Sequence, residues 1–201
     1  KTRLAVLSGR SLPDIKARVG LKNVVYGGCH GLEIEGAGFR FRHPTAGTRA
    51  ARVRTASRVL TRQLHRFPGA FLERKGVTVS LHYRKVPRRR RGDLVNLVRR
   101  VRRQVPGLTL LPGKDVLEFV PRVDWGKGQA ALWIARRLAR TLRPHRVVIL
   151  YAGDDATDEA AFAALKGRGV TVRVGARRGR AEYAAVTDKE ALEGFELLAK
   201  T

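Results

Sequence analysis

The first 45 residues alternate short apolar runs with polar and glycine-rich segments. Residues 4–7 and 24–26 are aliphatic and β-branched, a pattern that predicts buried strands. Residues 12–19 between them have the apolar spacing of a helix. A glycine-rich loop at 27–31 requires unusual backbone angles, and a short strand at 32–34 follows it. This order predicts the beginning of an α/β domain.

The pattern changes near Pro44, after which predicted helices alternate with pairs of strands. Residues 48–67 and 93–104 have helical spacing. Each helix is followed by a predicted hairpin, at 70–83 and at 108–120. Helix, hairpin, helix, hairpin is a self-contained α+β layer, so we interpret 46–122 as an inserted domain, a lid.

The last third returns to an alternation of single strands and helices. The predicted elements are a helix at 129–142, a buried parallel strand at 147–151, a helix at 157–165, a strand at 170–174 and a closing helix at 189–198. Residues 1–45 and 123–201 therefore form the two parts of one α/β core.

Four acidic residues follow the predicted strand at 147–151: Asp154, Asp155, Asp158 and Glu159. One aspartate there could cap the next helix and interact favourably with its dipole. Four carboxylates repel each other unless a cation lies among them, and Mg2+ prefers carboxylate oxygen and water. Open α/β sheets bind ligands at the carboxyl ends of their strands, so we favour a metal site over capping alone.

Two further segments have the residue types of a phosphate site. Ser8, Gly9 and Arg10 end the first strand before a helix, where a hydroxyl and backbone N–H groups can bind phosphate, although Ser8 could simply cap that helix. Lys127 lies in the first turn of a predicted helix, where a cation opposes the dipole. Contact with a phosphate explains the position of Lys127 better than the alternative, that Lys127 is an ordinary exposed surface lysine. His30 is either a structural histidine or part of a pocket.

The net charge of +25 comes mainly from arginine, which supplies 32 of the 42 basic residues. Nucleic-acid binding is one interpretation. Most of the arginines are dispersed and few aromatic residues accompany them, so we favour an arginine-rich surface with an anionic substrate and expect no nucleic-acid partner. Two clusters are exceptions. We expect Arg88–Arg91 in a solvated loop. We expect Arg99, Arg100, Arg102 and Arg103 on the outer face of a helix whose Leu94, Leu97, Val98 and Val101 turn inward.

Cysteine content and hydropathy restrict the compartment. Cys29 is the single cysteine of the 201 residues, which excludes an internal disulfide and fits a reducing environment. No apolar run approaches the length that spans a membrane, and no secretory signal is visible. We expect a cytoplasmic protein, a monomer without a membrane partner. Because the chain has no Met and opens almost directly on a strand, we also expect further residues upstream of Lys1.

Six motifs occur in a characteristic order along the chain. They are the segments 8–10, 30–33, 73–75, 81–84, 124–128 and 153–159. Together they resemble the trehalose-6-phosphate phosphatases of the haloacid dehalogenase (HAD) superfamily, over nearly all 201 residues. The resemblance implies a Rossmann-like HAD core with an inserted α+β cap domain, which agrees with the inserted domain at 46–122. It also implies Mg2+-dependent hydrolysis of trehalose 6-phosphate.

The resemblance implies roles for residues of the core. Ser8 would hold the transferring phosphoryl group and Lys127 would neutralise it. Asp154 would be a direct Mg2+ ligand, while Asp155 and Asp158 would hold metal-bound water or orient the site. Ser8, Lys127, Asp154 and Asp158 are thus the candidate catalytic residues, and Asp154 and Asp155 the candidate metal residues. Arg10 and His30 are candidates for contact with the substrate.

In the cap, Glu73, Lys75 and Glu118 match positions that bind the sugar hydroxyls, and Arg84 matches a further position near the sugar. Charged groups form strong hydrogen bonds with hydroxyls. The alternative for Glu73 and Lys75 is an ordinary hairpin charge pair, which contributes little to stability.

One family motif is absent. The first motif, DxDGT, supplies the nucleophilic Asp and the general acid/base Asp on a central strand, but no two aspartates here are spaced i, i+2. We favour a core that is incomplete at the N-terminus, with the nucleophile upstream and these 201 residues inactive on their own. The alternative is a non-catalytic regulatory domain that binds a sugar phosphate, fused to a trehalose-6-phosphate synthase.

Overall fold

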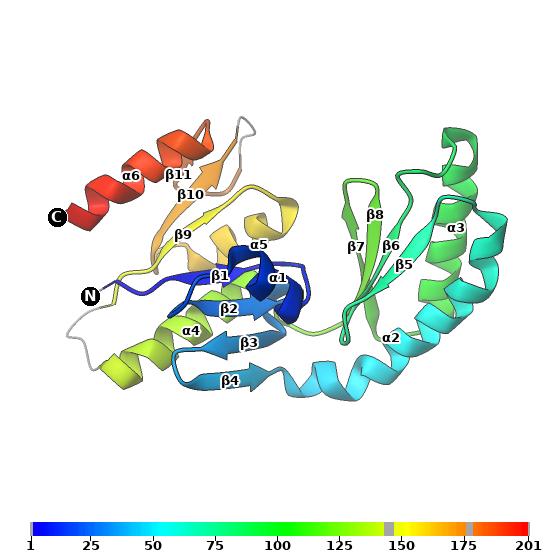
Figure 1. Cartoon of the computed structure of the whole chain (residues 1–201), viewed down its shortest axis with the longest axis horizontal. Coiled ribbons are helices and arrows are strands. Elements are labelled where there is room, and N and C mark those ends of the chain that lie inside the picture. The colour runs from blue at the N-terminus through cyan, green and yellow to red at the C-terminus, as the bar shows by residue number, and fades with distance from the viewer. Residues whose placement is uncertain (1, 143–146, 176–178, 201) are drawn as a thin grey trace. The chain divides into compact units, whose positions relative to one another are not determined.

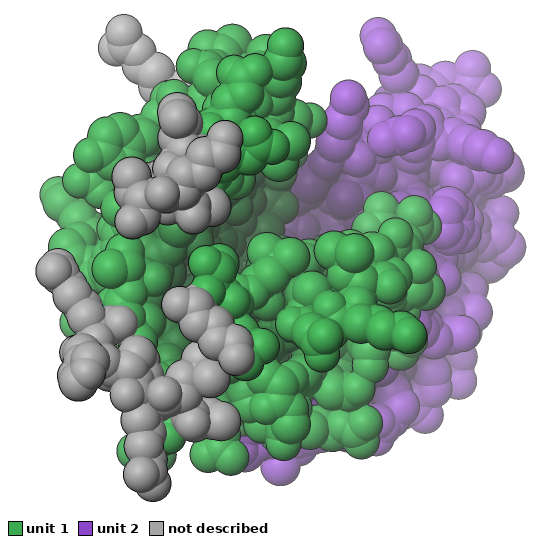
Figure 2. All heavy atoms as spheres, turned by 60° about the vertical axis from the view of Figure 1, so that its left-hand side comes forward, with its two compact units in different colours: residues 1–41, 125–201 green, residues 42–124 purple. Residues whose placement is uncertain are grey.

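The computed structural model describes residues 2–142, 147–175 and 179–200 (Figure 1). The chain divides into two compact units, coloured green and purple in Figure 2. The core unit comprises residues 1–41 and 125–201, and the inserted unit comprises residues 42–124. The range predicted for the inserted domain, 46–122, lies within the inserted unit.

The first sheet of the core unit has the strand order β1-β2-β3-β4. Its strands are β1 (Ala5–Leu7), β2 (Val25–Gly28), β3 (Glu33–Gly36) and β4 (Phe39–Arg42). β1 and β2 are parallel, and β2 and β3 are antiparallel. The crossover between the parallel strands is helix α1 (Leu12–Val19), which the apolar spacing predicted. β4 was not predicted, although the rings of its alternating Phe39 and Phe41 pack against Trp133, that of Phe39 edge to face, and the Phe41 ring also packs against Trp125.

The second sheet of the core unit has the order β11-β10-β9 and is parallel throughout. Its strands are β9 (Leu150–Gly153), β10 (Val170–Val174) and β11 (Tyr183–Ala185), and the helices of this half are α4 (Lys127–Leu142), α5 (Ala156–Leu165) and α6 (Asp188–Lys200). The predicted start of the buried strand at 147–151 was wrong. β9 begins at Leu150, and the side chains of Val147 and Val148 before it are 43% and 67% exposed. Among the residues that the structure describes, β9 pairs with β10 alone, and that pairing sets the limits of β9.

Within the described residues, each sheet of the core unit ends in a parallel edge strand whose outer side is unpaired. Over the described ranges, β1 forms ladder hydrogen bonds with β2 alone, and β9 with β10 alone. Leu7 of β1 packs against both apolar clusters of the core unit, one with Tyr151 and Phe162 and one with Val25. In Figure 1, β1, β2 and β9 run in the same direction, so their carboxyl ends lie on the same side of the core unit.

The inserted unit contains one antiparallel sheet with the order β5-β6-β8-β7. The strands are β5 (Phe71–Arg74), β6 (Val79–His82), β7 (Leu108–Gly113) and β8 (Val116–Pro121), and the helices are α2 (Pro44–Gln63) and α3 (Arg88–Gln104). Both helices share one buried cluster with the sheet, in which Leu60 and Leu94 meet Leu81 and Phe119. The helices therefore cover one face of the sheet, as Figure 1 shows.

The other face of this sheet is polar, as the alternation along β6 predicts. Val79 and Leu81 belong to the apolar cluster under the helices. Ser80 and His82 alternate with them and therefore lie on the opposite face. The polar face carries the candidate sugar-binding residues described below.

Helix α3 begins five residues before the predicted start. Arg88–Arg91 form its first turn and are not a loop, so that prediction was wrong. No capping residue marks this helix start, because Pro87 occupies the N-cap without a side-chain hydrogen bond and no acidic residue lies in the first turn. Arg91 instead bonds to the carbonyl oxygens of Val86 and Arg84.

Across the described ranges, none of the helices combines the length and the apolar character needed to cross a membrane.

The core of the inserted unit gives the first testable prediction. Phe119 is fully buried, so Phe119→Ala should lower the free energy of unfolding of that unit by about 3–5 kcal/mol. Phe71, which is 55% exposed and stacks on His82, is the matched control, and Phe71→Ala should cost less than about 1.5 kcal/mol. Urea unfolding followed by circular dichroism measures both. Equal losses would contradict the core described here.

Candidate active site at the carboxyl ends of the strands

The turn between β9 and α5 is built by reciprocal hydrogen bonds of two aspartates. Asp155 is the N-cap of α5, and its Oδ1 accepts the backbone N–H groups of Thr157 and Asp158 at 2.7 and 3.1 Å. Asp158 in turn accepts the backbone N–H of Asp155 at 3.0 Å. This is a capping box, so capping accounts for part of the acidic motif.

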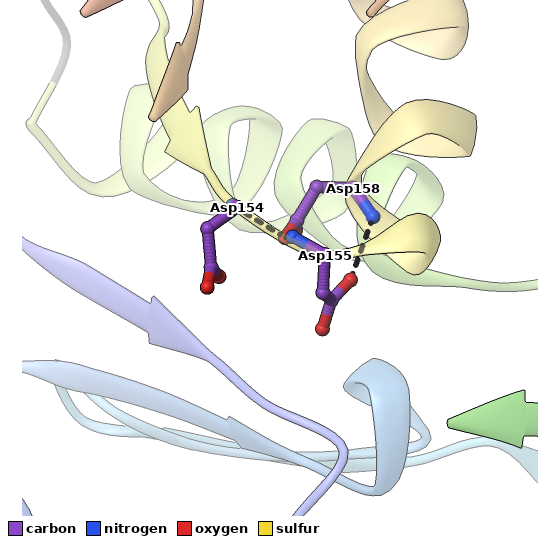
Figure 3. Close-up of side chains that lie close together, drawn as sticks. All are labelled: Asp154, Asp155 and Asp158. Carbon is purple, nitrogen blue, oxygen red and sulfur yellow. Dashed lines mark hydrogen bonds between the residues drawn. The ribbon is translucent and has the colours of Figure 1, made fainter. Parts of the chain in front are cut away.

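Asp158 is the centre of this turn and is 3% exposed. Its Oδ1 accepts hydrogen bonds from Lys127 Nζ at 2.9 Å and from the Tyr151 hydroxyl at 2.7 Å. Its Oδ2 accepts the backbone N–H groups of Asp154 at 3.1 Å and Asp155 at 3.0 Å (Figure 3). Four donors thus engage both oxygens, and Asp158 acts by positioning its neighbours.

Gly153 allows this close packing. A Cβ atom on Gly153 would lie 2.3 Å from Asp158 Cγ, closer than any real contact. The strand can therefore pass directly beside the Asp158 carboxylate only because its last residue has no side chain.

Lys127 begins α4 and is 6% exposed. Its ammonium lies 2.9 Å from Asp158 Oδ1 and 3.2 Å from Asp155 Oδ2. The two carboxylates compensate a cation that the helix dipole disfavours. An ammonium has three donors, and these contacts use two, which leaves a third for a phosphate oxygen.

Asp154 and Asp155 are both exposed, and Asp154 is the acid whose carboxylate has no described hydrogen-bond partner. One carboxylate oxygen each of Asp154, Asp155 and Asp158 lies within 4.8 Å of the others. In the described part of the chain no hydrogen bond or ion pair engages the Asp154 carboxylate, and Figure 3 shows it on the same side as that of Asp155. This all-oxygen donor set fits Mg2+, with Asp154 as the carboxylate free to bind it directly and water completing the shell.

The ionisation states of the turn follow from its contacts. Burial opposes ionisation of Asp155, but hydrogen bonds from Thr157 and the charge of Lys127 outweigh it and hold the pKa of Asp155 below its usual value. Burial raises the pKa of Tyr151 far above its usual value, and the negative charge of Asp158 adds to the effect. Tyr151 therefore remains a hydrogen-bond donor at every physiological pH.

Glu159, the fourth acid, has a structural role. Its Oε1 accepts a hydrogen bond from the buried Arg173 guanidinium at 3.0 Å, and its Oε2 accepts the backbone N–H of Arg180 at 2.7 Å. Arg173 also donates to the carbonyl oxygen of Asp155 at 3.1 Å and so supports the turn. The roles of Tyr151 and Arg173 were not predicted from the sequence. The available signal for Arg173 was a lone arginine within the otherwise apolar strand at 170–174.

The turn after β1 is fixed through its backbone. Ser8 donates its N–H to Gly27 O at 2.9 Å and accepts the N–H of His30 at its own carbonyl oxygen at 2.8 Å. The Ser8 hydroxyl accepts the N–H of Arg10 at 3.2 Å, so it stabilises its own turn. Helix α1 is capped by Ser11, not by Ser8.

The side chains of His30 and Arg10, the other two candidates near this turn, point in different directions. The His30 ring lies over Gly9, where an added Cβ would come within 2.7 Å of it. Arg10 forms an ion pair with Asp14 at 2.9 Å, one helical turn away, and its side chain is 48% exposed. The structure thus brings His30 against the Ser8 turn and directs Arg10 towards α1.

Three candidates of the inserted unit come together on the polar face of its sheet. Lys75 Nζ lies 3.3 Å from Glu118 Oε1 and 4.0 Å from Glu73 Oε2. The side chains of Lys75 and Glu118 are only 9% and 10% exposed, which differs from an ordinary exposed hairpin pair. Thr78 donates to Glu118 at 2.7 Å, and His82 Nε2 lies 2.8 Å from Glu73. We call Glu73, Lys75, Thr78, His82 and Glu118 the polar cluster.

Arg84 is not part of the polar cluster. Its side chain is 71% exposed, and its Nε lies 3.5 Å from Asp115. Thr78 and His82 were not predicted from the sequence, although they occupy polar positions in the alternating segment around β6.

Tyr151 provides a test of the acidic turn. Tyr151→Phe removes one of four donors to the buried Asp158 carboxylate and should lower the free energy of unfolding by about 1–3 kcal/mol. Tyr183→Phe, at a side chain that is 57% exposed, should change it by less than about 0.5 kcal/mol. Chemical denaturation of both variants provides the comparison. An unchanged free energy of unfolding in Tyr151→Phe would show that the Tyr151 hydroxyl does not stabilise Asp158.

Comparison with known proteins adds the family. A model of the trehalose-phosphatase family matches residues 1–190. Trehalose-phosphate phosphatase from Mycobacterium tuberculosis (strain ATCC 25618 / H37Rv) is 38% identical over 176 residues, which cover 85% of this chain and 44% of that protein. The enzyme of the same name from Mycobacterium avium (strain 104) is 34% identical, over 98% of this chain and 52% of that protein. The chain thus spans about half the length of these relatives.

Solved structures share the fold. A trehalose-6-phosphate phosphatase related protein superposes with a TM-score of 0.75 at 24% identity, over 97% of this chain and 81% of that one. The C-terminal domain of C. albicans trehalose-6-phosphate phosphatase gives 0.75 at 22% identity, over 98% and 78%. The α/β fold expected from the sequence, that of the HAD phosphatases, is confirmed. With the family model matching almost the whole chain, the protein belongs to the trehalose-phosphatase family.

Proposed function

We propose that this chain forms the phosphate- and sugar-binding parts of a Mg2+-dependent phosphatase that hydrolyses trehalose 6-phosphate to trehalose and phosphate. The observation that carries the proposal is the buried Lys127 ammonium held between Asp155 and Asp158, directly beside the exposed Asp154. A fixed cation next to a hard-oxygen cation site suits a phosphate monoester, whose oxygens can bind both. The names of the mycobacterial relatives support the same substrate.

The donor set of the acidic turn fits the cation. Asp154 and Asp155 would hold Mg2+, with Asp154 as the direct ligand. When bound, the ion supplies positive charge that stabilises the phosphoryl oxygens during transfer.

The protein's own residues orient the phosphate. Lys127 offers its third N–H to a phosphoryl oxygen, and Asp158 with Tyr151 keeps the ammonium in place. The Ser8 hydroxyl and the backbone N–H groups of its turn offer further donors to the transferring group. In this assignment Ser8 and Lys127 contact the substrate, whereas Asp158 positions Lys127.

Recognition of the sugar falls to the inserted unit. Glu73, Lys75 and Glu118 form a compact set of acceptors and donors on the polar face of the sheet, which suits the hydroxyl groups of a disaccharide. Arg84 and, in the core unit, Arg10 and His30 remain candidates through the family resemblance.

The attacking carboxylate has no candidate among the 201 residues, since none of their aspartates forms a DxDGT motif. We infer that it comes from an additional strand that pairs with the free edges of β1 and β9. Leu4 and Leu150 at these edges are 52% and 40% exposed, as expected of apolar side chains that another strand covers. The aspartate of that strand would attack phosphorus, the sugar hydroxyl would leave, and water would hydrolyse the aspartyl-phosphate.

The missing motif also favours a second candidate function, a domain that binds sugar phosphates without hydrolysing them. It would regulate a synthase to which it is joined. The two candidates share the binding residues and differ only in the source of a nucleophile.

Phosphate release separates the two candidates. We expect no phosphate release by the 201-residue chain, and Mg2+-dependent release from trehalose 6-phosphate by a chain that carries an upstream DxDGT strand. Replacement of the first aspartate of that motif by asparagine is the control and should abolish release. Equal rates on glucose 6-phosphate would contradict the substrate, and an inactive extended chain that still binds trehalose 6-phosphate would favour the regulatory domain.

Cation binding tests the acidic turn directly. Titration calorimetry of the chain with Mg2+ should show one weak site, and Asp154→Asn should reduce its affinity roughly tenfold or more. Asp93→Asn removes an exposed carboxylate of α3 and should leave the affinity unchanged within about twofold. Equal effects of the two substitutions would exclude Asp154 as the ligand.

A further inference from the structure

The two helices of the inserted unit are exceptionally rich in arginine. Residues 42–124 contain 21 Lys and Arg against five Asp and Glu, a net charge of +16 in a chain whose total is +25. Helices α2 and α3 together carry 13 arginines and a single acid, Asp93. Eight of these arginines form the two sequence clusters at 88–91 and 99–103, and the other five are spread along α2; the fold places both helices on one face of the sheet.

The arginines lie on the outer sides of the helices, away from the sheet. The inner side of α3 is formed by Leu94, Val98 and Val101, which are all buried. On α2, Arg54, Arg58 and Arg62 follow each other at intervals of four residues, about 6 Å apart along the helix axis. The exposed arginines of this surface, which we call the arginine face, are Arg54, Arg58, Arg62, Arg88, Arg89, Arg99, Arg100, Arg102 and Arg103.

Most members of the arginine face have no compensating partner. Asp93 pairs with Arg90, and Asp115 with Arg91 and Arg84. Within the ranges that the structure describes, no acid or hydrogen-bond acceptor engages Arg54, Arg62, Arg88, Arg89, Arg99, Arg100, Arg102 or Arg103. Like charges one turn apart destabilise a helix, so the arrangement serves no purpose in folding. A polyanion bound along the two helices would remove the repulsion.

The side chains of the arginine face discriminate between kinds of polyanion. The planar guanidinium fork matches phosphate oxygens better than an ammonium does. Neither helix carries an exposed large apolar side chain, which insertion into a membrane surface needs. Neither helix contains an aromatic residue, which stacking on single-stranded bases needs. The remaining match is the regularly spaced phosphate backbone of a duplex.

We propose that the arginine face binds the phosphate backbone of a nucleic-acid duplex, without reading its sequence. This revises the expectation of no nucleic-acid partner, which rested on the dispersal of most arginines along the sequence and on the few aromatic residues that accompany them. The polar cluster lies on the opposite face of the same sheet, so the proposal is independent of the phosphatase function.

The test compares two variants of the chain that lose the same charge. The first replaces four members of the arginine face by glutamine: Arg54, Arg62, Arg99 and Arg103. The control replaces four exposed basic residues of the core unit by glutamine: Arg136, Arg140, Lys166 and Arg168. Circular dichroism melts establish that both variants fold.

Fluorescence anisotropy with a labelled 20-base-pair DNA duplex, titrated at several salt concentrations, measures the affinity. The chain should bind at 50 mM salt, with an affinity that falls steeply as salt rises. The arginine-face variant should bind roughly tenfold or more weakly. The slope of log K against log salt should become shallower by up to about 3.6, because each of four lost phosphate contacts contributes about 0.9. The control should change the affinity by less than about threefold.

Three results would overturn the proposal. They are no binding to the duplex at 50 mM salt, an equal loss in the two variants, and binding to a polyglutamate peptide or to anionic lipid vesicles as tight as to the duplex. The first excludes a polyanion surface, the second assigns binding to net charge alone, and the third assigns the face to another class of partner.

Discussion

The buried ion pair between Lys127 and Asp158 is the interaction on which the candidate site depends. Two charges with 6% and 4% side-chain exposure are stable together only if their remaining hydrogen-bonding capacity is used. Tyr151 and two backbone N–H groups satisfy the carboxylate, and Asp155 supplies the ammonium with a second acceptor. The pair ties the start of α4 to the first turn of α5, and it leaves Asp154 exposed beside a fixed positive charge.

This constraint divides the four acids of the motif between two tasks. Asp158 and Glu159 are engaged by donors of the protein and shape the turn. Asp155 caps α5 and contacts Lys127, while Asp154 keeps its carboxylate available. Metal binding and helix capping were posed as alternatives from the sequence, but the geometry has room for both in one turn. The two sheet faces of the inserted unit are divided similarly, with arginines over the helices and the polar cluster opposite.

Much of this followed from the sequence because it depends on local patterns. Apolar spacing predicted α1 with its limits. The alternation along β6 predicted an apolar face that is covered, which is confirmed, and an opposite face that is open, whereas Ser80 and Glu118 on that polar face are buried. The rule that open α/β sheets bind ligands at the carboxyl ends of their strands led us to expect a metal site at the acidic turn after β9. Features set by tertiary pairing could not be predicted. The start of β9 depends on its pairing with β10, and the first turn of α3 has no capping side chain in the sequence. The role of Tyr151 depends on its contact with the Asp158 carboxylate, which also accepts a hydrogen bond from Lys127 of α4.

The central claim is that Lys127 and Asp154 serve one phosphate site. The most direct measurement is a crystal structure of the chain soaked with Mn2+ and inorganic phosphate, in which anomalous scattering locates the metal. The account predicts Mn2+ on the Asp154 carboxylate and a phosphate oxygen within hydrogen-bond distance of Lys127 Nζ, with the bond from Lys127 to Asp158 intact. Phosphate bound away from Lys127, or Mn2+ bound without Asp154, would contradict it.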